Sequence, residues 1–299
     1  MSHITVLLQE AVASLNLRPA SVVVDCTLGA GGHATEILRA LDADSVFVGI
    51  DKDPSALRAF AAKQPDTAAR VLLVEANYAD IREVLTSHKL THADAVLADL
   101  GWRMEQFDGS SGIARGFSFQ SDEPLHMTYG EPADYAFTAY DIVNDWPEED
   151  IANIIYAYGE DRQARRIARF IVEARHTAPI ATATDLADVV AQSIPKRFQS
   201  HRIHPATKTF QALRIAVNDE FDVLKDLIKT VPNILASTGR FSVISFHSME
   251  DRIVKHSFRS LEHDQEVVVV NKKPVIPSVE ERNNNPRARS AKLRTIEKI

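Results

Sequence analysis

The chain has 299 residues, of which 45% are hydrophobic and 25% are charged. These proportions exclude a disordered or fibrous protein and allow either one large α/β domain or two domains. The single cysteine, Cys26, excludes a disulfide framework and a cysteine-built metal site, which is typical of a reducing compartment. No basic leader and no apolar run of ~20 residues is visible, so we expect a cytoplasmic protein without a membrane segment.

The formal net charge of −7 argues at first against a nucleic-acid partner. The charge is unevenly distributed, however, because residues 1–105 and 106–206 are acidic whereas residues 207–299 carry a net charge of +4. Within that last third lies a stretch of thirteen residues without an acid, which contains Arg282, Arg287, Arg289, Lys292 and Arg294. This basic segment fits either a solvated tail or a surface that binds phosphates.

Four short β-branched runs follow one another in the first hundred residues, at 22–24, 46–50, 71–74 and 95–98. Helix-like segments lie between them, at 34–41 and at 54–63. The alternation predicts a parallel sheet with helices on both faces and right-handed crossovers. Three of these runs end in an acid, namely Asp25, Asp51 and Asp99. Ligands bind at the carboxyl ends of parallel strands, so we expect a site there.

The next strand of similar quality, residues 241–246, comes more than 140 residues after the fourth, which is too far for an ordinary crossover. Residues 141–196 show helical periodicity and almost no strand pattern. We therefore predict a sheet domain over 1–105, an inserted, mainly helical domain over 106–206, and the rest of the sheet domain over 207–299. A helix from about 249 to 260 and an antiparallel strand pair, 267–270 with 293–296, should complete that sheet.

The glycine-rich segment that runs from Asp25 to His33 lies between the first strand and a helix. Its glycines allow a tight turn and a close approach of the backbone to a ligand. The dinucleotide pattern Gly-x-Gly-x-x-Gly is incomplete, because Ala34 occupies its third glycine position. Asp51, at the end of the next strand, is suited to two ribose hydroxyls. Together these features indicate an adenosine-containing cofactor, either NAD or S-adenosylmethionine, unless the segment is only a structural turn beside a surface acid.

Other polar residues leave alternatives open. His33 fits the entry of a helix better than a ligand set, and His201 with His204 lacks the cysteines of a zinc site, so we expect no metal. His247 follows a strand, where helix capping and catalysis are equally compatible with the pattern. Asp99 is either a structural acid or the acceptor of a hydrogen bond from an amino group, which would prepare that nitrogen for attack.

Taken together, the motifs resemble the MraW-type family of S-adenosylmethionine-dependent methyltransferases, which modify a cytidine N4 in bacterial 16S ribosomal RNA. The resemblance covers nearly the whole chain in the family's order. Its motifs lie at 3–8, 25–33, 49–54, 99–101, 115–119, 158–162, 204–215, 217–220, 245–255 and 285–290.

The resemblance implies an α/β fold, a class I (Rossmann-like) S-adenosylmethionine-dependent methyltransferase sheet with an inserted, mainly helical domain. It implies 16S ribosomal RNA or the small ribosomal subunit as partner, with the target in the decoding centre. The cofactor contacts that it implies are Gly31, Gly32, His33, Asp51, Tyr78, Asp99 and Gln106. Asp99 would also orient the amino group, and the RNA would meet His204, Lys208, Arg214, His247, Arg287 and Arg289.

Two segments depart from the family's pattern. Trp102-Arg103-Met104-Glu105 stands where the family has Val-Ser-Ser-Pro, and His126 lies in a segment where the family reads Pro-Leu-Asp-Met-Arg-Met. Both flank the expected reacting centre. The alternative function is therefore a divergent paralogue that binds the cofactor or ribosomal RNA but methylates poorly, and a nicotinamide dehydrogenase is a weaker third. A homodimer is left open.

Overall fold

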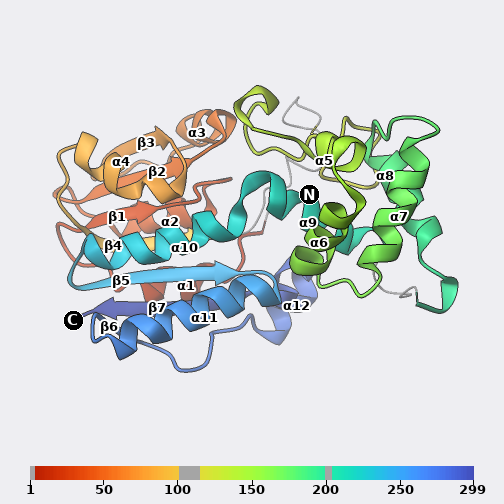
Figure 1. The fold of residues 1–299 in the computed structure, drawn as a ribbon. Coiled ribbons are helices and arrows are strands. Elements are labelled where there is room, and N and C mark those ends of the chain that lie inside the picture. The colour runs from red at the N-terminus through yellow and green to blue at the C-terminus, as the bar shows by residue number, and fades with distance from the viewer. Residues whose placement is uncertain (1–3, 101–114, 199–203) are drawn as a thin grey trace. The chain divides into compact units, whose positions relative to one another are not determined.

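The structure, a computed structural model, describes residues 4–100, 115–198 and 204–299. The chain forms two compact units (Figure 1). The first, which we call the sheet unit, comprises Met1–Trp102 and Phe221–Ile299, and the second, the helical unit, comprises Arg103–Glu220. Among the residues described, no helix is both long enough and apolar enough to cross a membrane.

A seven-stranded sheet forms the core of the sheet unit, in the order β3-β2-β1-β4-β5-β7-β6. Five strands are parallel: β1 (Val22–Asp25), β2 (Val46–Asp51), β3 (Arg70–Glu75), β4 (Ala93–Asp99) and β5 (Leu235–Ser245). The other two, β7 (Lys292–Lys298) and β6 (Val267–Val269), are antiparallel to their neighbours. This order confirms the expected Rossmann-like class I sheet, in which chain segments from both ends lie side by side (Figure 1).

Helices cover both faces of this sheet, because successive strand residues point to opposite sides. Val24, Val48 and Val96 pack with one layer of helices: α4 (Ile81–Ser87), α10 (Glu220–Thr230) and α11 (Ser248–His263). Phe47 and Leu97 pack with the other layer: α1 (Leu8–Ser14), α2 (Gly32–Ala40) and α3 (Pro54–Ala61). Burial on both faces explains why the strands read as continuous apolar runs.

Local signals account for where several elements begin. Proline at the first position of α3 follows Asp53, whose side chain accepts a hydrogen bond from the Ser55 amide at 2.8 Å. The expected strand pair at the sheet edge is confirmed as the antiparallel pair β6 and β7. β5 begins at Leu235, earlier than predicted. The apolar pattern did not include these first residues because 237–239 are polar or glycine, and the pairing with β4 shifts register there.

The helical unit confirms the mainly helical insert. Its helices are α5 (Ala139–Asp145), α6 (Glu148–Gly159), α7 (Ala164–Arg175), α8 (Ala183–Ser193) and α9 (Thr207–Asn218). Their apolar faces bury a core that includes Ile155, Ile171 and Leu213, and threonine capping boxes begin α5 and α8. We expected the insert to end at residue 206, but α9 packs against α6 and belongs to this unit.

A short helix, α12 (Val279–Asn284), and several single turns of 3-10 helix complete the regular structure of the described residues. Two of these turns carry predicted site residues. They are η1 (Tyr78–Asp80), which follows β3, and η6 (Pro286–Ser290), which precedes β7.

Candidate active site at the carboxyl edge of the sheet

Three carboxylates mark the carboxyl edge of the sheet. Asp25, Asp51 and Asp99 are the last residues of β1, β2 and β4, which are neighbours in the order β2-β1-β4. Asp25 pairs in register with Gly49 and with Leu97, so these strands end close to the same level. The parallel pairing therefore gathers at one edge the acids that the sequence pattern singled out.

The glycine loop between β1 and α2 is fixed by its backbone. Gly29 and Gly31 have φ values of 54° and 78°, which lie in the left-handed region that favours glycine. A Cβ atom added to Gly31 would come within 2.1 Å of the Phe60 ring, so this position also needs glycine for space. α2 begins at the next residue, which aims the free amides of its first turn at the carboxyl edge.

Asp51 joins this loop to the second strand. One carboxylate oxygen, Oδ2, accepts the Gly29 amide at 2.8 Å, and the other, Oδ1, accepts the Asp53 amide at 2.9 Å. A carboxylate accepts several hydrogen bonds at once, and it is the type of acceptor that ribose hydroxyls need. Tyr78 is half-buried and lies in the turn that follows the neighbouring strand β3, at the same edge of the sheet as Asp51. These donors and acceptors fit an adenosine group.

A buried histidine lies between one of the carboxylates and the backbone of Val6. His33 is 5% exposed, and its Nδ1 lies 3.5 Å from Oδ2 of Asp99. Its Nε2 lies 3.1 Å from the carbonyl oxygen of Val6. Thr27 links Asp99 to Asp25. Its hydroxyl oxygen accepts a hydrogen bond from the Asp99 amide at 2.7 Å, and its own amide donates to Asp25 Oδ1 at 3.1 Å.

Burial shifts the acid–base properties of this cluster. Asp25 is 1% exposed, and burial raises its pKa to about 6, although the nearby His33 opposes the shift. Burial also lowers the pKa of His33, despite Asp25 and the Val6 carbonyl acting in the opposite direction. Asp25 and His33 therefore favour their neutral forms more than the same groups would in water.

The structure adds residues that the sequence analysis missed. Thr27 lies inside the glycine-rich segment, where no pattern distinguishes it, and Val6 contributes through its main-chain oxygen, which no side-chain pattern identifies. A Cβ atom on Gly32 would lie 1.8 Å from Oγ1 of Thr5, so the chain before α1 packs directly on the start of α2. Gln106, also predicted to contact the cofactor, lies outside the described residues, as does the divergent segment 102–105.

Of the six residues expected to face RNA, three belong to the sheet unit. Arg287 and Arg289 are exposed in η6, just before β7, whose first residue pairs with Ser245 at the carboxyl end of β5. They therefore lie at the same edge as the carboxylates. His247 caps α11, with Nδ1 accepting the Glu250 amide at 3.4 Å, which confirms the capping alternative for this residue.

The other three belong to the helical unit. His204 is exposed and stacks on the Phe119 ring with centroids 4.5 Å apart, and Lys208 donates to the Glu160 carbonyl at 2.9 Å. For Arg214 the structure corrects the expectation. Its side chain is 2% exposed, and its Nε and Nη2 lie 2.6 and 2.8 Å from the Glu220 carboxylate, so it stabilises this unit instead of facing a ligand.

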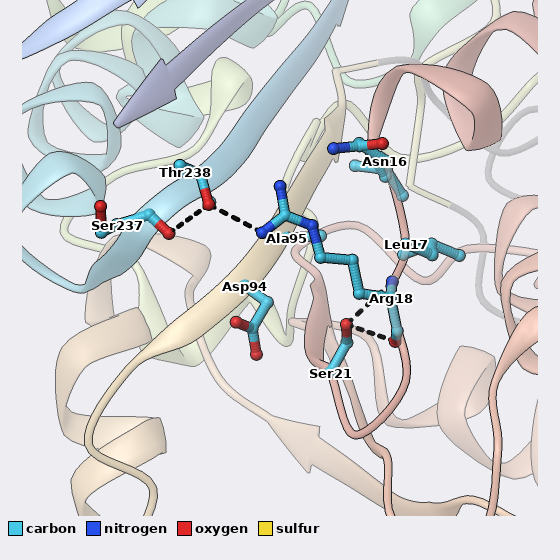
Figure 2. Close-up of a pocket in the computed structure, with 10 residues that line it drawn as sticks. Asn16, Leu17, Arg18, Ser21, Asp94, Ala95, Ser237 and Thr238 are labelled. Carbon is cyan, nitrogen blue, oxygen red and sulfur yellow. Dashed lines mark hydrogen bonds between the residues drawn. The ribbon is translucent and has the colours of Figure 1, made fainter. Parts of the chain in front are cut away.

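A small pocket lies at the opposite edge, near the amino ends of β1 and β4 (Figure 2). Arg18 Nη1 donates to Thr238 Oγ1 at 2.8 Å across it, and Asp94 accepts the Val22 amide at 2.7 Å. These contacts already pair its polar groups with the protein, and the acids of the carboxyl edge are absent from its lining. We therefore assign the candidate site to the carboxyl edge.

Comparison with known proteins gives a consistent family. The model of the MraW methylase family matches residues 1–299. A ribosomal RNA small subunit methyltransferase H from Clostridioides difficile (strain 630) is 41% identical, covering 99% of both chains. One from Syntrophus aciditrophicus (strain SB) is 43% identical, covering 99% of this chain and 98% of the relative. The solved structure of an rRNA methylase from Streptococcus thermophilus is 10% identical, with a TM-score of 0.43, and covers 97% of this chain and 93% of that one.

Proposed function

Because the chain belongs to the MraW methylase family, we propose that it methylates the exocyclic N4 of a cytidine in the decoding centre of 16S ribosomal RNA. The coarser activity is that of an S-adenosylmethionine-dependent methyltransferase of small-subunit ribosomal RNA. The observation that carries the finer proposal is Asp99 at the end of β4, beside a glycine loop and a ribose-type acid on adjoining strands.

The cofactor is S-adenosylmethionine, which supplies a methyl group bound to a positively charged sulfur. In our proposal the Asp51 carboxylate accepts hydrogen bonds from the two ribose hydroxyls, and the Tyr78 ring stacks on the adenine. Gly31, Gly32 and His33 line the methionine end, and Gln106 closes the site. The left-handed φ of Gly31 and the position of Asp51 at the end of β2, hydrogen-bonded to the glycine loop, support this arrangement.

Asp99 has the central role in the reaction. The lone pair of an aromatic amine is delocalised into its ring, so it attacks poorly until it is localised on nitrogen. A carboxylate that accepts a hydrogen bond from the amino group favours this localisation and can take the proton that the nitrogen loses. Holding the amine in line with the methyl group supplies much of the remaining rate enhancement.

RNA binding would rely on local clusters of arginine and lysine and on the shape of the RNA, since the chain as a whole is acidic. Arg287 and Arg289 are exposed at the carboxyl edge and suit phosphate groups. We also propose RNA contacts at His247 in the sheet unit and, separately, at His204 and Lys208 in the helical unit. Replacing both arginines with glutamate should weaken binding and lower the salt dependence of the affinity by about one unit of slope for each phosphate that is no longer bound. An unchanged slope would remove them from the RNA surface.

The experiment that tests the function is mass spectrometry of 16S ribosomal RNA from cells with and without this protein, combined with methyl transfer by the purified chain. Free 16S RNA and small-subunit particles should be compared as substrates. We expect one cytidine N4 methyl group to depend on the protein, and Asp99→Asn to abolish its formation. Asp94→Asn, at the other end of the same strand, serves as the matched control. An unchanged N4 methyl level at every cytidine would refute the proposal.

The second candidate is the divergent paralogue that binds but methylates poorly. It is favoured by the departures from the family's pattern at 102–105 and at His126. In the helical unit, Nδ1 of His126 is buried without a hydrogen-bond partner among the described residues. Tight binding of the cofactor with transfer no faster than in Asp99→Asn would favour this candidate. We place the protein in the cytoplasm, where its RNA substrate is, and a homodimer stays a prediction for sedimentation analysis.

A further inference from the structure

We propose that His33 is a positioning residue through which Asp99 passes on the proton lost by the attacking amino group. The inference rests on the proposed function and deepens it. It adds a step of proton transfer to the cofactor contact that the family resemblance implies for His33. Three features carry it: the contact of Nε2 with the Val6 carbonyl, the closeness of Nδ1 to Asp99, and the burial of the ring.

The tautomer follows from the contact with Val6. A carbonyl oxygen can only accept a hydrogen bond, so the Nε2 atom 3.1 Å from it must carry a hydrogen. In the neutral ring the other nitrogen, Nδ1, then holds a lone pair. This lone pair faces Oδ2 of Asp99 at 3.5 Å. Two acceptors that face each other are stabilised by a proton placed between them, so the geometry provides a place for one proton at Asp99.

The surroundings of His33 keep its Nδ1 atom unprotonated before the reaction. Asp99 from β4 lies 3.5 Å from Nδ1, the charge of Asp25 from β1 also acts on the ring, and Asp51 at the end of β2 acts on Asp25. Burial of His33 nevertheless lowers its pKa, so at neutral pH the ring is a neutral base. Thr27 fixes the position of the Asp99 backbone relative to Asp25, which keeps the pair of groups aligned.

The proton can be followed through the whole reaction. As the bond between N4 and the methyl carbon forms, the bond between that carbon and sulfur breaks, and N4 must release one hydrogen as a proton. The carboxylate of Asp99 takes this proton and then donates it to Nδ1 of His33. Asp99 is again negative, now beside an imidazolium whose Nε2 still donates its hydrogen bond to the Val6 carbonyl. The proton passes to solvent when the products leave, and no further reactant is required.

The kinetic test uses the full chain and His33→Gln. Glutamine can still donate an amide hydrogen to the Val6 carbonyl, but it has no group that titrates. The matched control is His92→Gln, because His92 is exposed and precedes β4 at the end opposite Asp99. Single-turnover methyl transfer to small-subunit particles is measured with saturating enzyme across the pH range of histidine titration, and calorimetry follows cofactor binding.

We expect the rates of the wild type and of His92→Gln to rise with pH through one ionisation and then level off. His33→Gln should lose this ionisation and have a plateau at least about 10-fold lower, within the range of general-base effects. Its cofactor affinity should change much less than its rate. A rate and pH profile that match the wild type would overturn the proposal.

Nitrogen-15 NMR of the imidazole gives a second readout, which requires no RNA. We expect hydrogen on Nε2 and none on Nδ1 at neutral pH, and a lower His33 pKa in Asp99→Asn, because the neighbouring negative charge is then absent. Hydrogen on Nδ1 alone would refute the proposal. If the wild type makes no N4-methylcytidine, the proposed function fails as well. Normal methylation by the wild type with an unaltered His33→Gln profile refutes the proton route alone.

Discussion

Asp25→Asn is expected to stabilise the folded protein at neutral pH. Burial raises the pKa of Asp25 from 3.8 to about 6, so between these values the folded protein holds a proton that the unfolded chain releases. The stability of the wild type therefore falls as the pH rises through this window, by about 3 kcal/mol in total at 1.36 kcal/mol per pKa unit. Asparagine does not ionise and escapes this loss, and its Oδ1 atom can still accept the Thr27 amide.

The assay is thermal and urea unfolding of both proteins at several pH values. For a unit of this size, about 3 kcal/mol corresponds to a midpoint higher by roughly 6–12 °C above pH 7, and the gain should vanish near pH 4. Asp42→Asn is a control of opposite sign, because hydrogen bonds from Ser45 and the Ala20 amide lower the pKa of Asp42. That variant should lose stability above pH 5. Equal midpoints for wild type and Asp25→Asn above pH 7 would refute the reasoning.

Three further changes test other contacts. Gly31→Ala should reduce cofactor affinity at least about 10-fold in calorimetry, because its Cβ would collide with the Phe60 ring at a left-handed φ; unchanged affinity would argue against the loop's role. Glu220→Gln should cost the helical unit about 3–5 kcal/mol in urea unfolding, since it leaves the buried Arg214 without its anionic partner; an unchanged urea midpoint would contradict this. Burial opposes ionisation of Asp251, but two cations of β7 outweigh it and lower its pKa, so acid should reduce the urea midpoint of the wild type more than that of Asp251→Asn; equal reductions would contradict this.

The sheet was predictable from the sequence because parallel strands buried on both faces leave a strong local pattern. The runs that end in Asp25, Asp51 and Asp99 show it, and their spacing sets the crossovers. The insert was predictable because the gap between residue 98 and residue 241 is too long for an ordinary crossover. The start of β5 was hidden because the polar residues 237–239 interrupt its apolar run.

The remaining features depend on contacts between distant residues, which no local pattern encodes. His33 meets Asp99 across 66 positions of the chain only because β1 and β4 are neighbours. Arg214 lies in a basic-looking motif, and the sequence does not show that Glu220, at the start of the next helix, neutralises it. The sequence therefore does not distinguish a charged side chain that binds a partner from one that is buried in an ion pair.

The position of the helical unit within the chain also affects how the protein is made. The inner strand β4 ends at Asp99, and its partner β5 begins at Leu235. At ~5–20 residues per second, a ribosome needs roughly 7–27 s to synthesise the intervening segment. During this interval the nascent sheet has an unpaired apolar edge, which is a template for aggregation. The helical unit can fold first, and chaperone demand should peak before β5 leaves the exit tunnel.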